Sequence, residues 1–182
     1  MSIKCSVFIA TSLDGFIARN NGDLDWLPGS DGTAGGEDYG FNNFFASIDA
    51  LVMGRKTYEL ACSFNEWPYR GKHVIVLSGS FPKAPKSIGE GITGTSSSPT
   101  DVLRHLTSIG SKHVYVDGGK TIQSFLRENL IHEMTVTRIP VLIGEGIPLF
   151  GPLAHDVKMQ HIETKAYESG FVQSKYKVAN DA

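Results

Sequence analysis

Runs of apolar residues alternate along most of the chain with segments in which apolar residues recur at helical spacing. The runs that predict strands lie at residues 3–11, 50–54, 73–78, 92–97 and 112–119. Several of them are dominated by Val, Ile and Leu, which is typical of strands buried on both faces of a sheet. The segments that predict helices lie at residues 37–48, 55–64, 99–110 and 120–130. The pattern therefore indicates repeated units of strand and helix.

The last third of the chain follows a different pattern. Residues 133–142, 158–169 and 171–179 predict three strands without intervening helices, and Ser169 and Gly170 predict a hairpin turn between the last two. Strands that alternate with helices run parallel, whereas strands joined by hairpins run antiparallel. The sequence therefore predicts an α/β fold with a mostly parallel central sheet, an antiparallel C-terminal edge and helices on both faces.

Single residues indicate where some of these elements begin and end. Pro99 begins the third predicted helix and Gly110 ends it. Asp49 precedes a predicted strand, and we expect it to order the entry into the sheet. Stretches rich in Gly, Pro and Ser at 31–38 and 80–91 predict loops.

Composition and charge narrow the class of protein. With 182 residues, 41% hydrophobic and 20% charged, the chain is expected to form a single globular domain over residues 1–182. A net charge of -2 and a pI of about 6.3 provide no field that would attract nucleic acid, so we expect no polynucleotide partner. The expected partner is a small molecule.

The sequence gives little indication of a membrane span, a signal peptide or a metal site. No apolar stretch approaches the roughly 20 residues that cross a bilayer, and the apolar run after Lys4 is too short for a signal peptide. Cys5 and Cys62 are isolated in the sequence, which suits a reducing compartment. The six histidines show no spacing typical of metal ligands. We therefore expect a cytoplasmic protein with no membrane contact and no metal site.

Glycines, serines and cations gather where predicted parallel strands end. MGRKT follows the strand at 50–54, LSGS follows the strand at 73–78, and DGGKT follows the strand at 112–119. Open α/β sheets bind ligands at the carboxyl ends of their strands, where helix N-termini favour phosphate groups. These three ends therefore predict a ligand with more than one phosphate.

Common nucleotide and hydrolase motifs do not account for these segments. A P-loop ending in DGGKT would need its first glycine at Val114, and a G-x-G-x-x-G motif beginning at Gly144 would need its third glycine at Leu149. No G-x-S-x-G occurs, so a hydrolase nucleophile elbow is not supported.

Five motifs in order support a family resemblance. They are SLDGFIA (12–18), DWLP (25–28), DALVMGRKTYE (49–59), VDGGKTIQSFL (116–126) and LIHEMTVTRIPVLIGEGIPLFG (130–151). Together they resemble the dihydrofolate reductase superfamily, and more closely the reductase domain of riboflavin-biosynthesis deaminase-reductases, here as a free-standing protein. The resemblance implies a mostly parallel eight-stranded sheet, a homodimer, and an NADPH-dependent enzyme that passes hydride to a pyrimidine- or pterin-like heterocycle. Such an activity would be similar to 5-amino-6-(5-phosphoribosylamino)uracil reductase.

The resemblance also implies which residues bind NADPH. Pyrophosphate contacts fall on Gly54, Arg55, Lys56 and Thr57, and contacts at the second glycine-rich turn fall on Gly118, Gly119, Lys120 and Thr121. Ser78 and Ser80, together with Arg55 or Lys56, would favour the 2′-phosphate of NADPH over NADH. The first strand and the loop that closes over nicotinamide contribute Ala10, Asp14, Gly15 and Ile17. Asp14 could instead shape the turn before Gly15.

The substrate residues follow from the same resemblance. Asp38 lies 15 residues before Met53, the spacing of the pterin-binding carboxylate in dihydrofolate reductases. Further substrate contacts are implied for Trp26, Asn42, Phe45 and Thr137. The segment between Trp26 and Asp38 is longer than in that family, and the D-x-P-x-L-x-x-R segment of the riboflavin branch is missing. The substrate is therefore open between pyrimidine and pterin rings, and a dihydrofolate reductase-type activity or a non-catalytic NADPH-binding module are alternatives.

Asp38 is the expected catalytic residue. Burial against Phe41, Phe45 and Trp26 would raise its pKa by desolvation and suit it to relay a proton near neutral pH. The alternative is a carboxylate that merely stabilises the N-terminus of the predicted helix, a role that Glu37 could also fill.

Overall fold

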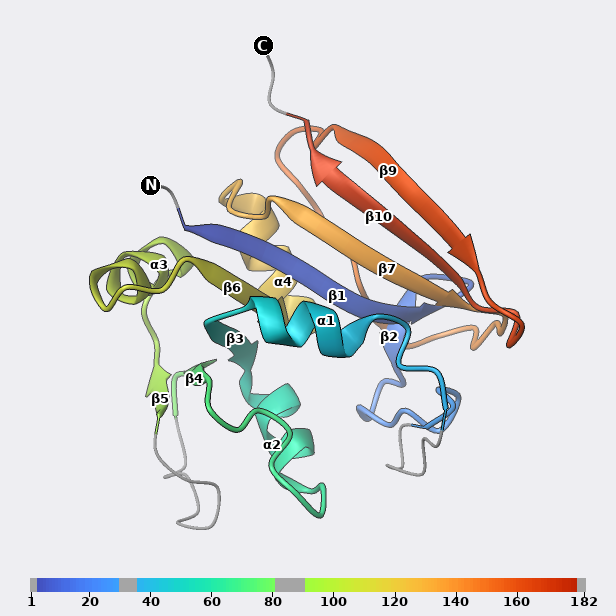
Figure 1. Cartoon of the computed structure of the whole chain (residues 1–182), viewed down its shortest axis with the longest axis horizontal. Coiled ribbons are helices and arrows are strands. Elements are labelled where there is room, and N and C mark those ends of the chain that lie inside the picture. Colours follow the sequence, from blue (N-terminus) through green and yellow to red (C-terminus); the bar gives the residue numbers. More distant parts are fainter. Residues whose placement is uncertain (1–2, 30–35, 81–90, 180–182) are drawn as a thin grey trace.

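The computed structural model describes residues 3–29, 36–80 and 91–179. Within these residues an eight-stranded sheet has the order β5 (Ile92–Thr95), β4 (His73–Leu77), β3 (Ala50–Gly54), β6 (His113–Asp117), β1 (Lys4–Ser12), β7 (Glu133–Ile139), β10 (Val172–Val178) and β9 (Met159–Ala166). The strands from β5 to β7 run parallel, and β10 and β9 are antiparallel to their neighbours. Figure 1 shows the long β9–β10 hairpin at one edge. The predicted α/β fold with an antiparallel C-terminal edge is confirmed.

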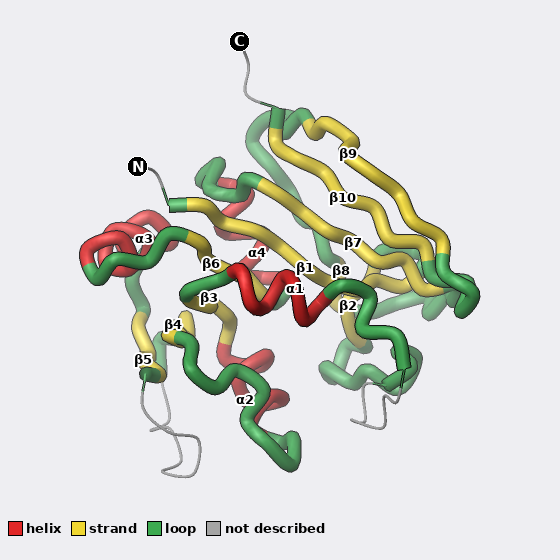
Figure 2. Tube along the Cα trace, viewed as in Figure 1, coloured by secondary structure: helices red, strands yellow, loops and turns green. Residues whose placement is uncertain are grey.

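The helices cover both faces of this sheet, as predicted. They are α1 (Phe41–Ser47), α2 (Arg55–Cys62), α3 (Pro99–Ser108) and α4 (Gly119–Arg127). Successive residues of a strand point to opposite faces, so Val52 packs with α3 and α4 whereas Leu51 and Met53 pack with α1 and α2. Figure 2 shows α1 crossing in front of the sheet and α4 behind it. No helix in the described part of the chain is long and apolar enough to cross a membrane.

The hairpin predicted at Ser169 and Gly170 joins β9 to β10. Gly170 has a left-handed φ of 82°, and its N–H donates to the Tyr167 carbonyl at 2.9 Å. Because β10 lies between β7 and β9, the last strand of the fold is an inner strand of the sheet. Its side chains therefore reach toward the residues of β7.

A second sheet of two strands was not predicted. It pairs β2 (Phe16–Ala18) with β8 (Ile147–Pro148) in antiparallel fashion. These strands have three and two residues, which is too short for a period of two to emerge from the sequence. The pairing brings the loop after β1 against the segment before residue 150.

The first helix begins later than predicted. Instead of starting at residue 37, α1 starts at Phe41, because Tyr39 and Gly40 have left-handed φ angles of 53° and 82°. Residues in this conformation cannot continue a right-handed helix. Asp38 therefore lies before the helix and not on its surface. Most of the loops predicted at 31–38 and 80–91 lie outside the described residues.

Asp49 has the structural role that was expected. Its Oδ2 atom accepts hydrogen bonds from the backbone N–H groups of Lys112 at 2.8 Å and His113 at 2.9 Å. These bonds tie the entry of β3 to the entry of β6 and lower the pKa of the Asp49 carboxyl. The two strands therefore start in register and also end together.

Candidate active site

The ends of β3 and β6 meet in a tight junction. Met53 and Asp117 are paired in the two strands, and Gly54 and Gly118 follow them. A Cβ atom on Gly118 would lie 2.6 Å from Thr57 Oγ1 and 3.7 Å from the Gly54 nitrogen, so this turn accepts no side chain. A Cβ on Gly54 would lie 3.1 Å from Thr121 Oγ1. The structure thus brings four predicted cofactor residues, two glycines and two threonines, to one place.

The loop after β1 closes against the same junction. A Cβ atom on Gly119 would lie 3.0 Å from Ile17 Cδ1 and 3.2 Å from the Pro148 carbonyl oxygen. The two-stranded sheet therefore packs directly on the start of α4, with Ile17 against the second glycine. This placement brings the predicted nicotinamide loop and the second glycine-rich turn together.

Asp14 fastens that loop. Its carboxylate accepts hydrogen bonds from Ser12 Oγ at 2.6 Å, Gly144 N at 2.8 Å and Ile143 N at 3.2 Å. The Ser12 hydroxyl and these backbone N–H groups hold the pKa of Asp14 below its usual value. Gly15, with a φ of 89°, turns the chain directly afterwards. The geometry of Asp14 is that of a turn residue, and a cofactor contact stays a prediction.

The predicted 2′-phosphate residues lie at the start of α2 and in the segment directly after β4. The Arg55 guanidinium donates from Nε to Glu59 Oε1 at 2.6 Å and from Nη1 to Ser80 Oγ at 3.1 Å. Ser78 Oγ donates to the Ser80 carbonyl at 2.7 Å. Exposed Lys56 follows Arg55 in the same first turn, and exposed Lys120 lies in the first turn of α4. Arg55, Ser78 and Ser80 therefore form one connected group on the surface.

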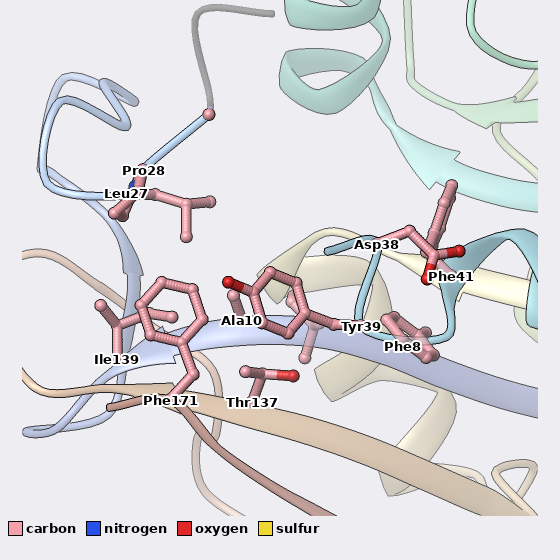
Figure 3. Close-up of a pocket in the computed structure, with 12 residues that line it drawn as sticks. Phe8, Ala10, Leu27, Pro28, Asp38, Tyr39, Phe41, Thr137, Ile139 and Phe171 are labelled. Atoms are coloured by element: carbon pink, nitrogen blue, oxygen red, sulfur yellow. The ribbon is translucent and has the colours of Figure 1, made fainter. Parts of the chain in front are cut away.

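A pocket of about 220 Å³ opens over β1, the strand next to β6. Its walls come from β1, β7, the segments before and after the undescribed residues 30–35, the start of α1, and Phe171 in the turn before β10 (Figure 3). The lining residues are Phe8, Ile9, Ala10, Leu27, Pro28, Gly29, Asp38, Tyr39, Phe41, Thr137, Ile139 and Phe171. Of the predicted site residues, Ala10, Asp38 and Thr137 are among them. The wall is mainly aromatic and aliphatic, with the Asp38 carboxylate and the hydroxyl groups of Thr137 and Tyr39 as polar groups.

The prediction that Asp38 is buried, with a raised pKa, is wrong. The side chain is exposed, and its carboxylate accepts hydrogen bonds from Asn42 N at 2.9 Å and Gly40 N at 3.0 Å. These N–H groups lower its pKa, whereas burial was expected to raise it. The physical reason is the late start of α1, which leaves Asp38 at the rim of the pocket. Its geometry matches the alternative of a carboxylate that stabilises the helix start.

Three predicted substrate residues do not line this pocket. Asn42 is exposed, and Phe45 stacks on Phe41 at 5.8 Å with Lys72 Nζ 5.0 Å from its ring centre. Trp26 is 9% exposed and packs behind the wall against Ile139 and Phe171. Its indole Nε1 is buried and has no hydrogen-bond partner among the described residues. Trp26 supports the wall, whereas Asn42 and Phe45 face elsewhere.

Asp117, the last residue of β6, was not among the predicted site residues. Burial of its carboxyl group raises its pKa to about 6, although the Gly118 N–H at 2.8 Å and the Tyr115 hydroxyl work in the opposite direction. Asp117 directly precedes the Gly118 and Gly119 pair, so the rule that drew attention to the strand end could also have selected it. Tyr115 connects this carboxyl to the pocket, since its hydroxyl donates to the Phe8 carbonyl at 2.9 Å.

The fold is that of dihydrofolate reductases. Dihydrofolate reductase from Enterococcus faecalis, in complex with NADP(H) and RAB-propyl, superposes with a TM-score of 0.67 at 17% identity, covering 97% of both chains. Within this fold class the chain belongs to the RibD C-terminal domain family, whose sequence model matches residues 4–173. The resemblance stated from the five motifs is confirmed.

Two relatives span almost the whole chain. The uncharacterized protein YwjB of Bacillus subtilis is 33% identical over 170 residues, which cover 92% of this chain and 94% of YwjB. The crystal structure of a proposed riboflavin biosynthesis protein from Shewanella sp. PV-4 is 38% identical, with a TM-score of 0.88 over 98% of this chain and 100% of that one. The family therefore includes proteins of this size.

Proposed function

We propose that this protein is an NADPH-dependent reductase that transfers a hydride to a pyrimidine- or pterin-like heterocycle. The observation that carries the proposal is the junction of Gly118 with Thr57, where the starts of α2 and α4 meet without room for a side chain. Such an edge suits a pyrophosphate. β1, which lies next to β6, lines an apolar pocket that has few polar groups and is large enough for a ring.

The residues around the junction fit NADPH by their chemistry. Thr57 and Thr121 would add hydroxyl groups to the N–H groups of the two helix starts. Arg55, already directed toward Ser80, would bind the 2′-phosphate that distinguishes NADPH from NADH. NADPH would supply the hydride, and the protein would supply orientation and the proton. The Enterococcus reductase, which has the same fold, is described with NADP(H).

Two carboxyl groups have separate roles in this proposal: Asp117 donates the proton and Asp38 binds the ring. Reduction of a C=N or C=O bond takes up one proton besides the hydride. Asp117, with a pKa of about 6, holds a proton closer to neutral pH than Asp38 does. Asp38, which is ionised, would accept a hydrogen bond from an N–H group of the ring. Asp117 replaces Asp38 as the proposed proton source.

The first test is thermal unfolding with NADPH, NADP+, NADH or no ligand. A ligand at 100 times its Kd adds about 2.7 kcal/mol to the free energy of unfolding, which raises Tm by several degrees. We expect a rise with NADPH and NADP+ and little with NADH. Arg55→Ala should abolish this preference, and Arg104→Ala, an exposed arginine on α3, serves as the matched control. No rise with any of the three would reject the proposal.

The second test follows NADPH oxidation with pyrimidine and pterin rings, including dihydrofolate. Oxidation with one of them, lost in Asp117→Asn while the NADPH-induced rise in Tm remains, would support a reductase. Binding of NADPH without oxidation of any ring would instead support a non-catalytic NADPH-binding module. A homodimer and a cytoplasmic location, both expected from the sequence, belong to the same proposal and can be checked by light scattering and fractionation.

A further inference from the structure

The Gln173 side chain joins two residues of the pocket wall, Thr137 and Tyr39, to Tyr167. Gln173 on β10 is paired with Thr137 on β7. Its Nε2 atom lies 2.9 Å from Thr137 Oγ1 and 3.0 Å from the Tyr39 carbonyl oxygen. Its Oε1 atom accepts a hydrogen bond from the Tyr167 hydroxyl at 3.3 Å. Both N–H bonds and the oxygen of this half-buried amide are therefore used.

The chemistry of these partners fixes the direction of each hydrogen bond. A carbonyl oxygen only accepts, so the amide atom that faces Tyr39 O is the NH2 group. The same nitrogen also faces Thr137 and can only donate, so Thr137 Oγ1 must accept. The Thr137 hydroxyl proton is then directed away from Gln173. Among the described residues the Thr137 side chain has no other hydrogen bond, and Thr137 is a lining residue of the pocket.

We infer that Gln173 is a specificity-determining residue: it makes Thr137 a hydrogen-bond donor to the ring that binds in the pocket. Asp38, as a carboxylate, can only accept. The pocket thus offers one donor from β7 and one acceptor from the rim, and it selects a heterocycle with a carbonyl oxygen or unprotonated ring nitrogen facing Thr137 and an N–H facing Asp38. This inference rests on the proposed function and deepens it by naming the groups that the ring must carry.

Gln173 also positions the segment that holds Asp38. The Tyr39 carbonyl, bound by Gln173, belongs to a residue with a left-handed φ of 53°, a strained conformation outside glycine. The Tyr39 ring stacks on Phe171 at 5.0 Å and meets the Tyr167 ring edge-on at 4.8 Å. Figure 3 shows the Tyr39 ring between the side of the pocket formed by Phe171 and the side formed by Asp38. The donor and the acceptor therefore depend on the same amide.

The experiment compares Gln173→Met, Thr137→Val and the double variant. Urea unfolding first establishes whether Gln173 and Thr137 interact in solution. If they do, the two changes are not additive, and the double variant loses less stability than the sum of the single ones. Ser174→Ala is the control, because its hydroxyl contacts Thr164 at 2.8 Å and points to the other face of β10. Ser174→Ala combined with Thr137→Val should be additive.

Ring binding is then measured by NMR titration with uracil and with pterin, which needs no turnover. Thr137→Val should lower the affinity for whichever ring binds by about five- to tenfold, the effect of losing one hydrogen bond. Gln173→Met should weaken ring binding at least as much, because it affects both the Thr137 donor and the segment that holds Asp38, and the double variant should lose less affinity than the sum of the two single variants. Thr137→Ser, which keeps the hydroxyl, should bind normally.

Three results would overturn the inference: additive stability losses, additive losses of ring affinity, or no binding of either ring to the unchanged protein. Failure of the proposed reductase activity looks different. It would leave the binding pattern of Thr137 and Gln173 intact while NADPH is not oxidised. The rise of Tm with NADPH should persist in all of these variants, since none lies at the Gly54 and Gly118 junction.

Discussion

A Cβ atom on Gly118 would lie 2.6 Å from the Oγ1 atom of Thr57, so the turn after β6 and the first turn of α2 meet without room for a side chain. Gly118 also has a left-handed φ of 91°. Position 118 therefore requires glycine for two independent reasons, its left-handed backbone conformation and the lack of room for a Cβ atom. Mutations can separate the two effects.

Gly118→Ala is expected to destabilise the protein by about 1 to 2 kcal/mol from backbone strain, with an additional cost from the clash with Thr57. Thr57→Ala in the same chain should relieve the clash and leave the strain. Thermal unfolding measures both, with Gly79→Ala as control, because a Cβ there meets no atom within 4 Å. A Tm of Gly118→Ala equal to that of the unchanged protein would contradict the described junction.

Asp117 should make stability depend on pH in the direction of a raised carboxyl pKa. Its contribution is fully present below the ordinary pKa of 3.8 and is lost as pH rises through about 6. Asp117→Asn should therefore gain stability relative to the unchanged protein by about 2 kcal/mol between about pH 4.5 and about pH 8. Urea unfolding at the two pH values measures this gain. A constant difference between the two proteins would show that the carboxyl group is not buried.

Asp38 should show the opposite dependence. Because the Asn42 and Gly40 N–H groups lower its pKa, its contribution is present above the ordinary value of 3.8 and is lost as pH falls through the lowered one. Asp38→Asn should raise KM, because Asp38 is proposed to accept a hydrogen bond from the ring. It should not remove the inflection near pH 6 from the pH profile of NADPH oxidation. Asp117→Asn should remove that inflection. If the Asp38→Asn enzyme lacks the inflection, the proton source is Asp38 and not Asp117.

Asp14→Asn should loosen the contact between the loop after β1 and residues 143–144. An amide has one acceptor oxygen where the carboxylate has two, so it cannot accept from Ser12, Ile143 and Gly144 together. We expect a lower Tm and faster hydrogen exchange at β2 and β8, with β9 and β10 unchanged. Asp23→Asn is the control, since Asp23 is bonded locally to Asn21 in an exposed turn. Equal exchange in both variants would argue against this role of Asp14.

Most of the fold could be predicted because the inner parallel strands β3, β4 and β6 are strongly apolar. Leu51, Val52 and Met53 are all fully buried, and such a run has few alternatives to a strand covered on both faces. The two-stranded sheet was missed because its strands are only three and two residues long, and the start of α1 was missed because it depends on distant contacts. Tyr39 is held in a left-handed conformation by Gln173 and Phe171, which lie more than 130 residues further along the chain. No local pattern contains such contacts.

The site residues that could be predicted are those marked by a local pattern in the sequence. Glycines at strand ends, together with the family resemblance, led to the junction of Gly54 and Gly118, and the structure brings these residues together. Asp38 was expected to be buried because a continuous helix was assumed, and Asn42 and Phe45 were assigned by the same assumption. Asp117 was overlooked because its raised pKa comes from burial of its carboxyl group, which becomes visible only in three dimensions.

The position of β10 inside the sheet has an evolutionary consequence. The residues proposed for the cofactor belong mainly to β3, β6 and the helices that follow them, whereas the C-terminal hairpin contributes Phe171 to the pocket wall and Gln173 behind Thr137 and Tyr39. Mutations in β9 and β10 can therefore alter which ring is accepted while the cofactor junction stays intact. Relatives of one family could diversify their substrates by changing this hairpin, and exchanging residues 159–178 between two of them would transfer ring preference without transferring cofactor preference.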